Sequence, residues 1–470
     1  SEEGLGDLFS PSLEIRKSAS LRIYLSLATA SFFTKNRKER EASGDSHLKS
    51  ASLLFLCRKM MNEIEKWLNG RIGLNFRSGL ERMQRAVDLL GNPERAYPVI
   101  HVTGTNGKGS TIAFMRNLFA DQGKKVASFT SPHMISVHDR ICINGLPISD
   151  ADFVRLGRQI QEMERELVKT HDQLSYFEIL TLLAFLYFRE EKVDLALIEV
   201  GIGGLLDTTN VLDGQVAVVT SVGLDHQETL GQTITAIAEQ KAGIFKKGRS
   251  AVIGPLPEEA RQVCEQRAAS LNLDLYEYGR DFSFSDGSFK NQDLLLSHVT
   301  LGLQGAYQEE NAALALQAFL LFMKQMGWEI DFSLLPSSLQ KTHWAGRLEE
   351  IRPNIYLDGA HNLPALARLV EFIKGQKGKT CNLLFGALKR KDYSGMLTYL
   401  QENLPEVQVT VTSFDYGESV GQAEAADFDY VADYRAFIEN FKQEQTADQV
   451  LFVTGSLYFI AEVRAYLQSV

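Results

Sequence analysis

The chain has 470 residues, of which 44% are hydrophobic and 23% are charged, and its formal net charge at pH 7 is −10. This composition is typical of a soluble globular protein, and the length favours two or three domains over one core. The negative charge argues against non-specific binding to nucleic acid. The four cysteines, Cys57, Cys142, Cys264 and Cys381, form no CxxC pair. We therefore expect neither a disulfide framework nor a zinc site, and a reducing cytoplasm fits best.

Residues 1–59 differ from the rest of the chain because they show no strong apolar periodicity. We expect this segment to be a poorly ordered extension. Its apolar run Leu21–Phe33 contains Ala28-Thr-Ala30, which imitates a signal-peptide cleavage site, so a targeting role stays open as the alternative. The run is too short to span a bilayer, and we expect no membrane association.

Between residues 60 and 342 apolar runs alternate with helical patterns, which predicts an α/β domain with a mostly parallel sheet. Short antiparallel strands are expected from Phe282 to Leu303. The expected strands of the main sheet are Val99–Thr103, Lys125–Phe129, Asp194–Val200, Gln215–Val222 and Ser250–Gly254, and the expected helices include Ala151–Lys169, Phe177–Phe188 and Glu310–Met326.

Residues 343–350 form a plausible linker, after which the alternation of strands and helices starts again. This restart predicts a second, smaller Rossmann-like α/β domain over residues 351–470, of a size usual for one domain. Its expected strands are Ile351–Leu357, Cys381–Leu384, Val407–Ser413 and Gln449–Thr454.

The stretch His101–Thr111, with the sequence HVTGTNGKGST, lies between an expected strand and an expected helix. Glycines let backbone N–H groups turn inward, and a helix N-terminus adds a favourable dipole, so this context suits a phosphate group. The literal Walker pattern fails, because Val102 stands where it requires glycine and Gly109 where it requires a hydroxyl residue. The stretch is therefore either a variant phosphate-binding loop, with Lys108 reaching the outer phosphates, or an ordinary glycine-rich turn.

Several other polar residues follow expected strands, where open α/β sheets bind their ligands. Glu199 ends a strand-like run, and we favour a Mg²⁺ ligand over a solvated acid there, with Asp207 close behind. His226 also follows a strand, although a lone histidine is more often structural. The remaining candidates lie past a strand or at the domain junction: Ser131, Arg347, Asp358 and His361.

Lys241 is anomalous because it shares one helix face with apolar residues. Ile234, Ile237 and Ala238 precede it at the spacing of a single helical face. A free ammonium group buried there would cost several kcal/mol unless it were paired. Either the side chain extends outward to solvent, or the lysine is chemically modified, for example as a carbamate.

Together these residues resemble the folylpolyglutamate synthase family, including its bifunctional dihydrofolate synthase form, within the Mur-type ATP-dependent amide ligases. Three positions depart from the common family pattern: Leu205, Thr208 and Asp139. The motifs that carry the resemblance occur in the family's order over everything from about residue 61 onward, and they are Thr103–Thr111, Thr130–His133, Glu199–Gly204, Leu206–Asn210, Leu224–His226, Glu239–Phe245, Gly346–Leu348, Leu357–Asn362 and Thr454–Tyr458.

The resemblance implies that ATP phosphorylates the terminal carboxylate of a folate, or of dihydropteroate, and that the amino group of L-glutamate then displaces phosphate. It implies catalytic roles for Lys108, Lys241, His226 and Arg347, with Lys241 carbamylated. It places Asp207 near the pterin and His361 near the glutamate, and it implies a monomer. The Mg²⁺ ligands that it implies are Ser110, Ser131, Glu199 and His226, and the nucleotide contacts are Gly104, Thr105, Asn106, Gly107, Lys108, Gly109, Ser110, Thr111, Asn311, Arg347, Asp358 and His361.

Three other functions compete with this interpretation. A cell-wall ligase of the same superfamily would accept a UDP-linked sugar peptide instead of a folate. A GTPase switch would need an Asn-Lys-x-Asp motif, and the chain contains no Asn-Lys dipeptide. A non-catalytic nucleotide-binding module is disfavoured by the joint presence of Lys108, Glu199, His226 and Lys241.

Overall fold

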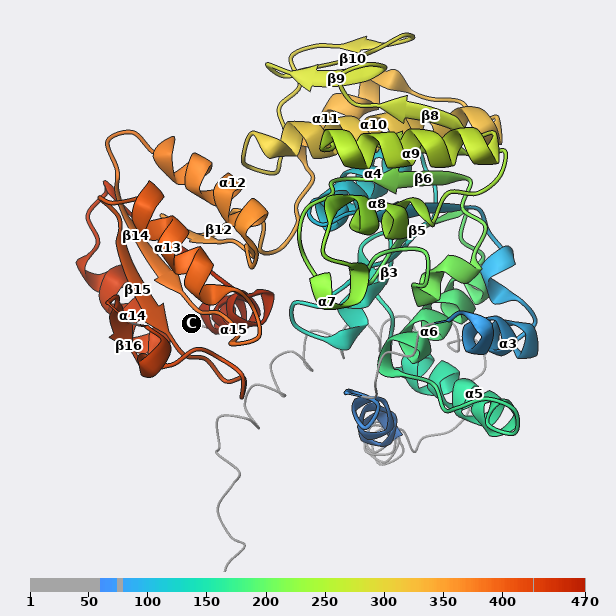
Figure 1. Ribbon diagram of the computed structural model, residues 1–470, viewed down its shortest axis with the longest axis horizontal. Coiled ribbons are helices and arrows are strands. Elements are labelled where there is room, and N and C mark those ends of the chain that lie inside the picture. The colour runs from blue at the N-terminus through green and yellow to red at the C-terminus, as the bar shows by residue number, and fades with distance from the viewer. Residues whose placement is uncertain (1–59, 74–78, 426, 470) are drawn as a thin grey trace, which may run out of the picture.

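The computed structural model describes residues 60–73, 79–425 and 427–469. Figure 1 shows a larger body, built from residues up to 342, beside a smaller C-terminal lobe built from residues 349–469. The expectation for residues 1–59 lies outside the described residues. No helix among the described residues is both long enough and apolar enough to cross a membrane.

An eight-stranded sheet forms the centre of the body, in the order β4-β3-β2-β5-β1-β6-β7-β8. Pairing is parallel from β2 through β8, whereas β3 and β4 join the edge in antiparallel orientation. The strands are β1 (Val99–Thr103), β2 (Val126–Phe129), β3 (Ile141–Ile143), β4 (Leu146–Pro147), β5 (Leu195–Glu199), β6 (Val216–Val219), β7 (Ser250–Ile253) and β8 (Asp274–Glu277). Every residue of β1, β2, β5, β6 and β7 is buried, which explains their nearly continuous apolar sequences.

Helices cover both faces of this sheet, and alternate residues of β1 point into different cores. Ile100 and Val102 pack with α4 and α10, whereas Val99 packs on the opposite side with α3, α5 and α6. In the first core, the ring of Phe119 lies 4.9 Å from that of Phe319. The helices of the body are a helix over 60–69, α3 (Glu81–Leu89), α4 (Lys108–Asp121), α5 (Asp150–Leu167), α6 (Tyr176–Glu190), α7 (Gln227–Leu230), α8 (Ile234–Ala242), α9 (Glu258–Leu271), α10 (Tyr307–Met326) and α11 (Leu335–Gln340).

A three-stranded antiparallel sheet packs on α10 at the top of Figure 1. It consists of β9 (Phe282–Ser285), β10 (Ser288–Asn291) and β11 (Leu295–Leu296). The body and lobe also contain short 3₁₀ segments, at Pro93–Arg95, Val137–Arg140, Thr208–Val211, Phe332–Leu334 and Gln422–Glu424.

The C-terminal lobe has a six-stranded sheet in the order β12-β13-β17-β14-β15-β16, parallel except for the β12–β13 pair. Its strands are β12 (Glu349–Arg352), β13 (Ile355–Leu357), β14 (Thr380–Phe385), β15 (Gln408–Thr412), β16 (Asp429–Val431) and β17 (Gln449–Thr454). Its helices are α12 (Leu363–Lys374), α13 (Tyr393–Asn403), α14 (Tyr434–Glu444) and α15 (Leu457–Ser469).

The predicted α/β class, with a mostly parallel sheet and a second α/β unit, is confirmed. The single strand expected at Ile351–Leu357 is wrong in detail, because the chain reverses there as a hairpin. Asn354 makes that turn possible with a left-handed φ of +61°, a conformation that asparagine tolerates better than most residues. Strand β16 was not predicted, because it is short and half-exposed and so lacks a buried apolar run.

We expect Gly254→Ala to lower the free energy of unfolding by about 1–3 kcal/mol. A Cβ at Gly254, directly after β7, would lie 2.2 Å from the backbone oxygen of Thr220, which cannot move without disturbing the end of β6. Urea denaturation measures the difference. Gly417→Ala is the matched control, since a Cβ at Gly417 would lie within 4 Å of no atom of another described residue beyond its chain neighbours. Equal midpoints for the two variants would contradict the expectation.

Candidate active site

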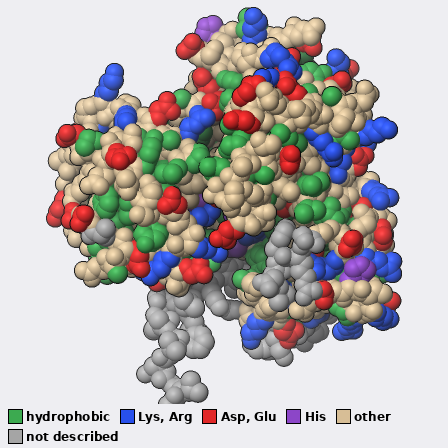
Figure 2. All heavy atoms as spheres, viewed as in Figure 1, with side chains coloured by type: hydrophobic (Ala, Val, Ile, Leu, Met, Phe, Trp, Pro, Cys, Tyr) green, Lys and Arg blue, Asp and Glu red, His purple; other side chains and the backbone are tan. Residues whose placement is uncertain are grey.

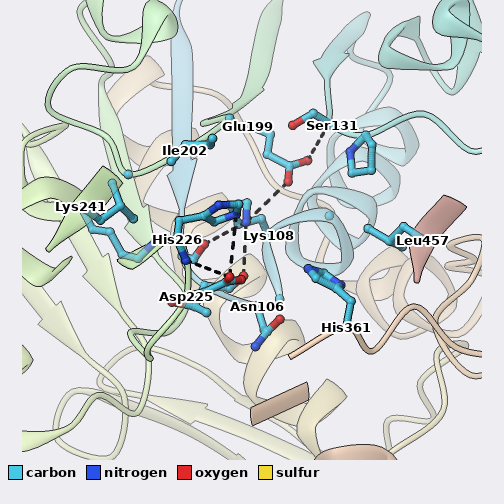
Figure 3. Close-up of a pocket in the computed structure, with 18 of the residues that line it drawn as sticks. Asn106, Lys108, Ser131, Glu199, Ile202, Asp225, His226, Lys241, His361 and Leu457 are labelled. Atoms are coloured by element: carbon cyan, nitrogen blue, oxygen red, sulfur yellow. Dashed lines mark hydrogen bonds and ion pairs between the residues drawn. The ribbon is translucent and has the colours of Figure 1, made fainter. Parts of the chain in front are cut away.

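One cavity lies where the carboxyl ends of β5, β1 and β6 meet, with β2 next to β5. This edge is where open α/β sheets bind ligands. Figure 3 shows side chains from these loops pointing toward one another, with His361 and Leu457 approaching from the C-terminal lobe. The predicted site residues that line the cavity are Gly104, Thr105, Asn106, Gly107, Lys108, Gly109, Ser131, Glu199, His226, Lys241, Arg347 and His361.

The glycine-rich loop between β1 and α4 is fixed to the end of β6. The N–H of Asn106 donates to Ser221 Oγ at 2.9 Å, and the carbonyl oxygen of Asn106 accepts from the Thr220 hydroxyl at 2.6 Å. Gly107 has a φ of +90°, and a Cβ there would lie 2.4 Å from Asn311 Oδ1. Only glycine fits this position, from which the backbone turns into the N-terminus of α4. The loop therefore has the geometry of an anion-binding turn.

Lys108 and Glu199 bring opposite charges to the floor of the cavity. Lys108 Nζ lies 3.9 Å from Glu199 Oε1 and donates a hydrogen bond of 2.8 Å to the carbonyl oxygen of Gly104. Burial lowers the pKa of Lys108 and raises the pKa of Glu199, and each charge opposes the other's shift. The N–H of Ser131 donates to Glu199 Oε2 at 3.2 Å. This pair presents a cation and an anion beside the loop.

The residues predicted to bind Mg²⁺ differ in how deeply they are buried. Glu199 and Ser131 lie together, His226 lines the same cavity with 43% of its side chain exposed, and Ser110 is buried in the first turn of α4. No cluster of three His, Cys, Asp or Glu side chains that could hold a metal occurs in the described part of the chain. Mg²⁺ takes oxygen ligands and usually keeps waters and substrate phosphates, so one carboxylate and one hydroxyl beside a phosphate loop fit it.

Lys241 is buried, as its position on an apolar helix face predicts, with 3% of the residue exposed. The alternative that its side chain reaches solvent is therefore wrong. Burial, with the nearby charge of Lys108, lowers the pKa of Lys241 to about 7. No hydrogen bond or ion pair joins its ammonium group to another described residue, although it lines the cavity. A large fraction of Lys241 is thus a neutral amine at physiological pH.

Other predicted residues lie behind the cavity wall. Asn311 donates to Gln308 Oε1 at 2.9 Å, and Thr111 is buried with no hydrogen-bond partner for its hydroxyl in the described part of the chain. Asp358 accepts the N–H groups of Leu348 and Ala360, each at 3.0 Å. These residues are placed to shape the loops around the cavity.

Asp207 lies behind the loop Gly201–Gly204 and is buried, with 2% of the residue exposed. It accepts hydrogen bonds from the N–H groups of Ile202 and Thr209, each at 3.0 Å. Burial raises its pKa, and these bonds oppose the rise. Its carboxylate is occupied within the protein, so its contact with a substrate stays a prediction.

The C-terminal lobe closes the cavity through a seam of polar contacts. Asn362 donates to Asp225 Oδ2 at 3.0 Å and accepts from Asn106 of the glycine-rich loop at 3.2 Å. Lys391 Nζ lies 3.0 Å from Asp225 Oδ1. Opposite charges of the two parts therefore meet at the cavity edge, where Figure 2 shows charged side chains in the recess between body and lobe.

Three members of this seam were not predicted as site residues: Asp225, Asn362 and Lys391. Asp225 lies within the motif Leu224–His226 and Asn362 ends the motif Leu357–Asn362, so the sequence carried a signal for both. Lys391 carried none, because it is one of three successive basic residues in a loop, Lys389-Arg390-Lys391, and such a run is ordinarily solvated.

Comparison with known proteins identifies a matching family model and relatives of this chain. Residues 102–319 match the Mur ligase middle domain. The chain is 35% identical to the dihydrofolate synthase/folylpolyglutamate synthase of Bacillus subtilis over 435 residues, which covers 86% of this chain and 99% of that protein. It is 35% identical to the folylpolyglutamate synthase of Lacticaseibacillus casei, covering 82% of this chain and 94% of that protein.

Solved structures agree with these matches. The apo form of L. casei FPGS superposes with a TM-score of 0.78 at 31% identity, and an FPGS–AMPPCP–folate complex with a TM-score of 0.78 at 32% identity. Each comparison covers 87% of this chain and 99% of the other. The chain therefore belongs to the folylpolyglutamate synthase/dihydrofolate synthase family of Mur-type ATP-dependent ligases.

Proposed function

We propose that this protein is an ATP-dependent ligase that joins L-glutamate to the γ-carboxylate of folates, with dihydropteroate as a second acceptor. The observation that carries the proposal is the one cavity in which a phosphate loop, the Lys108–Glu199 pair, Lys241, the linker residue Arg347 and the lobe residue His361 meet. The naming of its relatives as dihydrofolate synthase and folylpolyglutamate synthase supports both acceptors.

The reaction needs two displacements, and the cavity supplies groups for each. In the first, a carboxylate oxygen of the folate attacks the γ-phosphorus of ATP, and ADP departs, leaving an acyl phosphate. The N–H groups of the glycine-rich loop and Lys108 hold the phosphates and neutralise the charge that develops, with Arg347 as a further cation from the linker between body and lobe. Glu199 and Ser131, with His226 nearby, would hold Mg²⁺, which would supply further neutralisation of the phosphates.

In the second displacement, the amino group of L-glutamate attacks the acyl carbon and phosphate leaves. His361 is suited to orient this amine. Its Nδ1 donates to the carbonyl oxygen of Gly359 at 2.8 Å, and burial lowers its pKa to about 4. The imidazole is therefore neutral at physiological pH, and Nε2 is left as an acceptor for an amine N–H.

We also propose that Lys241 carries a carbamate. A neutral amine reacts with CO₂, forming an N–C bond and releasing one proton, and the product is an anion in place of a buried cation. The pKa of about 7 makes the reactive neutral form abundant, and its fraction rises as the pH rises through that value. The carbamate would place negative charge in the cavity beside Lys108 and the expected metal.

We further propose a cytoplasmic monomer whose functional units are residues 60–342 and 351–470. The three described cysteines, Cys142, Cys264 and Cys381, are buried free thiols, which supports a reducing compartment. On the face drawn in Figure 2, acidic and basic side chains are interspersed, in keeping with the absence of nucleic acid from the proposed partners.

The decisive experiment is a product assay that compares tetrahydrofolate monoglutamate, dihydropteroate and a UDP-linked sugar peptide as acceptors. We expect ADP formation that requires both L-glutamate and one of the two pteroyl acceptors. Mass spectrometry should show a γ-glutamyl product from tetrahydrofolate monoglutamate and dihydrofolate from dihydropteroate. Turnover of the sugar peptide alone would identify a cell-wall ligase instead. No ADP and no ligated product with either pteroyl acceptor would refute the proposal.

We expect Glu199→Gln to reduce kcat about 100-fold, equivalent to about 2.7 kcal/mol, because the metal loses its charged ligand. The amide oxygen of the variant still accepts from the N–H of Ser131, so the fold should persist. The measurement is the Mg²⁺ dependence of ADP formation. Glu258→Gln, which changes an exposed acid on α9, is the control. An unchanged Mg²⁺ requirement in Glu199→Gln would remove Glu199 from the metal site.

We expect ¹³C-bicarbonate to give the native protein a carbamate signal in ¹³C NMR that Lys241→Met lacks. The signal should be stronger at pH 8 than at pH 6, because more of the amine is neutral above its pKa. Lys246→Met is the control, since this lysine is half-buried and its ammonium group bonds the carbonyl oxygen of Asn210. A signal that survives in Lys241→Met, or no signal in the native protein, would rule out the carbamate.

A further inference from the structure

A buried chain of hydrogen bonds connects β1 to the loop Gly201–Gly204, which forms part of the cavity wall. His101 lies in the middle of β1 and is fully buried. Its Nε2 lies 2.9 Å from Thr209 Oγ1, and that hydroxyl lies 2.5 Å from Asp207 Oδ1. Asp207 Oδ2 in turn accepts the N–H of Ile202 at 3.0 Å. Ile202 lines the cavity and is labelled in Figure 3.

The direction of each hydrogen bond follows from the groups involved. The Thr209 hydroxyl has a single proton, which it donates to the Asp207 carboxylate. Thr209 Oγ1 must then accept from His101, so Nε2 carries the ring proton. Burial lowers the pKa of His101 to about 3, with Lys246 adding to the effect, so the ring is neutral with Nδ1 bare. Nδ1 has no hydrogen-bond partner among the described residues, so the bond to Thr209 is the polar contact that orients the ring.

The same strand holds the loop at a second point. Thr103, two residues after His101, donates to the carbonyl oxygen of Gly203 at 2.6 Å. The phosphate loop begins at the next residue, Gly104. Strand β1 therefore fixes both walls of the cavity, the phosphate loop by continuity and the Gly201–Gly204 loop through His101 and Thr103. A glycine-rich loop has few side chains to hold it, so these bonds contribute to fixing the position of its backbone.

We propose that His101 and Thr209 are positioning residues, which act through Asp207 to hold the Gly201–Gly204 backbone, and with it Glu199, in register with the phosphate loop. Neither residue is among those that line the cavity, so neither is placed to touch a substrate. The proposal rests on the proposed ligase reaction for its kinetic effect. Its structural content concerns the loop alone, so loop exchange tests it independently of turnover.

The test compares Thr209→Val, which keeps the volume and removes the hydroxyl, with Thr209→Ser, which keeps the hydroxyl. Hydrogen–deuterium exchange of the peptide that contains Ile202 should be at least about tenfold faster in Thr209→Val and near native in Thr209→Ser. In the turnover assay, kcat should fall at least about tenfold in Thr209→Val, with the KM for ATP within about twofold of native. Sites are counted by titration with a non-hydrolysable ATP analogue, so unfolded protein does not enter kcat.

Thr412→Val is the matched control, because Thr412 is a fully buried threonine in β15 of the lobe, where it bonds the carbonyl oxygen of Ser413. A general loss of stability would accelerate hydrogen exchange in both valine variants. Loss of the His101–Thr209–Asp207 hydrogen bonds should accelerate exchange at Ile202 only in Thr209→Val.

His101→Leu removes the other end of these hydrogen bonds, and its exchange rate and kcat should change as they do in Thr209→Val. His101→Gln, which can donate from a similar position, should restore at least part of the loss.

The double variant His101→Leu/Thr209→Val separates a chain from two independent contributions. If His101 acts through Thr209, the kcat of the double variant is no lower than that of Thr209→Val alone. The proposal would be overturned if the fold loss of kcat in the double variant equalled the product of the two single losses. Native hydrogen exchange at Ile202 in Thr209→Val would overturn it as well. If Thr209→Val does not fold, the His101→Leu and His101→Gln pair decides by the same two measurements. A native protein that exchanges as expected but forms no glutamylated product would refute the proposed function and leave the positioning role standing.

Discussion

The meeting of three parallel strand ends at one cavity is the constraint on which the rest of this structure depends. Strand β1 lies between β5 and β6, so the phosphate loop, Glu199 and the Thr220–Ser221 segment are neighbours by topology. Burial there opposes both charges of the Lys108–Glu199 pair. The charged forms of both side chains are stabilised because each charge attracts the other. The carbonyl oxygen of Gly104 and the N–H of Ser131 add hydrogen bonds to them. A nucleotide and metal entering this cavity would meet charges already in place.

The variant phosphate loop is explained by its neighbours rather than by its own sequence pattern. Gly104 and Gly107 stand where a Cβ would collide with Thr220 Oγ1 and Asn311 Oδ1. Gly109 lies against Trp344, and a Cβ there would be 2.7 Å from the indole Nε1. Gly104 and Gly109, which depart from the Walker pattern, thus pack against the end of β6 and the segment leading into the lobe, whereas Gly107, which matches the pattern, packs against α10. Their positions reflect close packing around the loop as much as phosphate binding.

Much of this arrangement could be predicted because burial leaves a periodic signal. The main strands were found from apolar runs, and β1 and β17 have the predicted bounds. Lys241 was identified because a charge on an apolar helix face breaks the period, and it is indeed buried. His101 and Lys391 could not be found in this way. A polar residue within a buried strand looks like a tolerated exception, and a lysine in a basic loop looks solvated, so their roles depend on distant partners.

The lobe completes a site that the body leaves open on one side. Asn362 forms hydrogen bonds with both Asp225 and Asn106, so a single lobe residue connects to the loop after β6 and to the phosphate loop. Arg368 pairs with Glu310 of α10 at 2.8 Å, which gives the seam a second ion pair. Both pairs are partly exposed, and such pairs stabilise weakly. The contacts between body and lobe are therefore suited to form and break, as they must if two substrates and ATP enter one cavity and the products leave it.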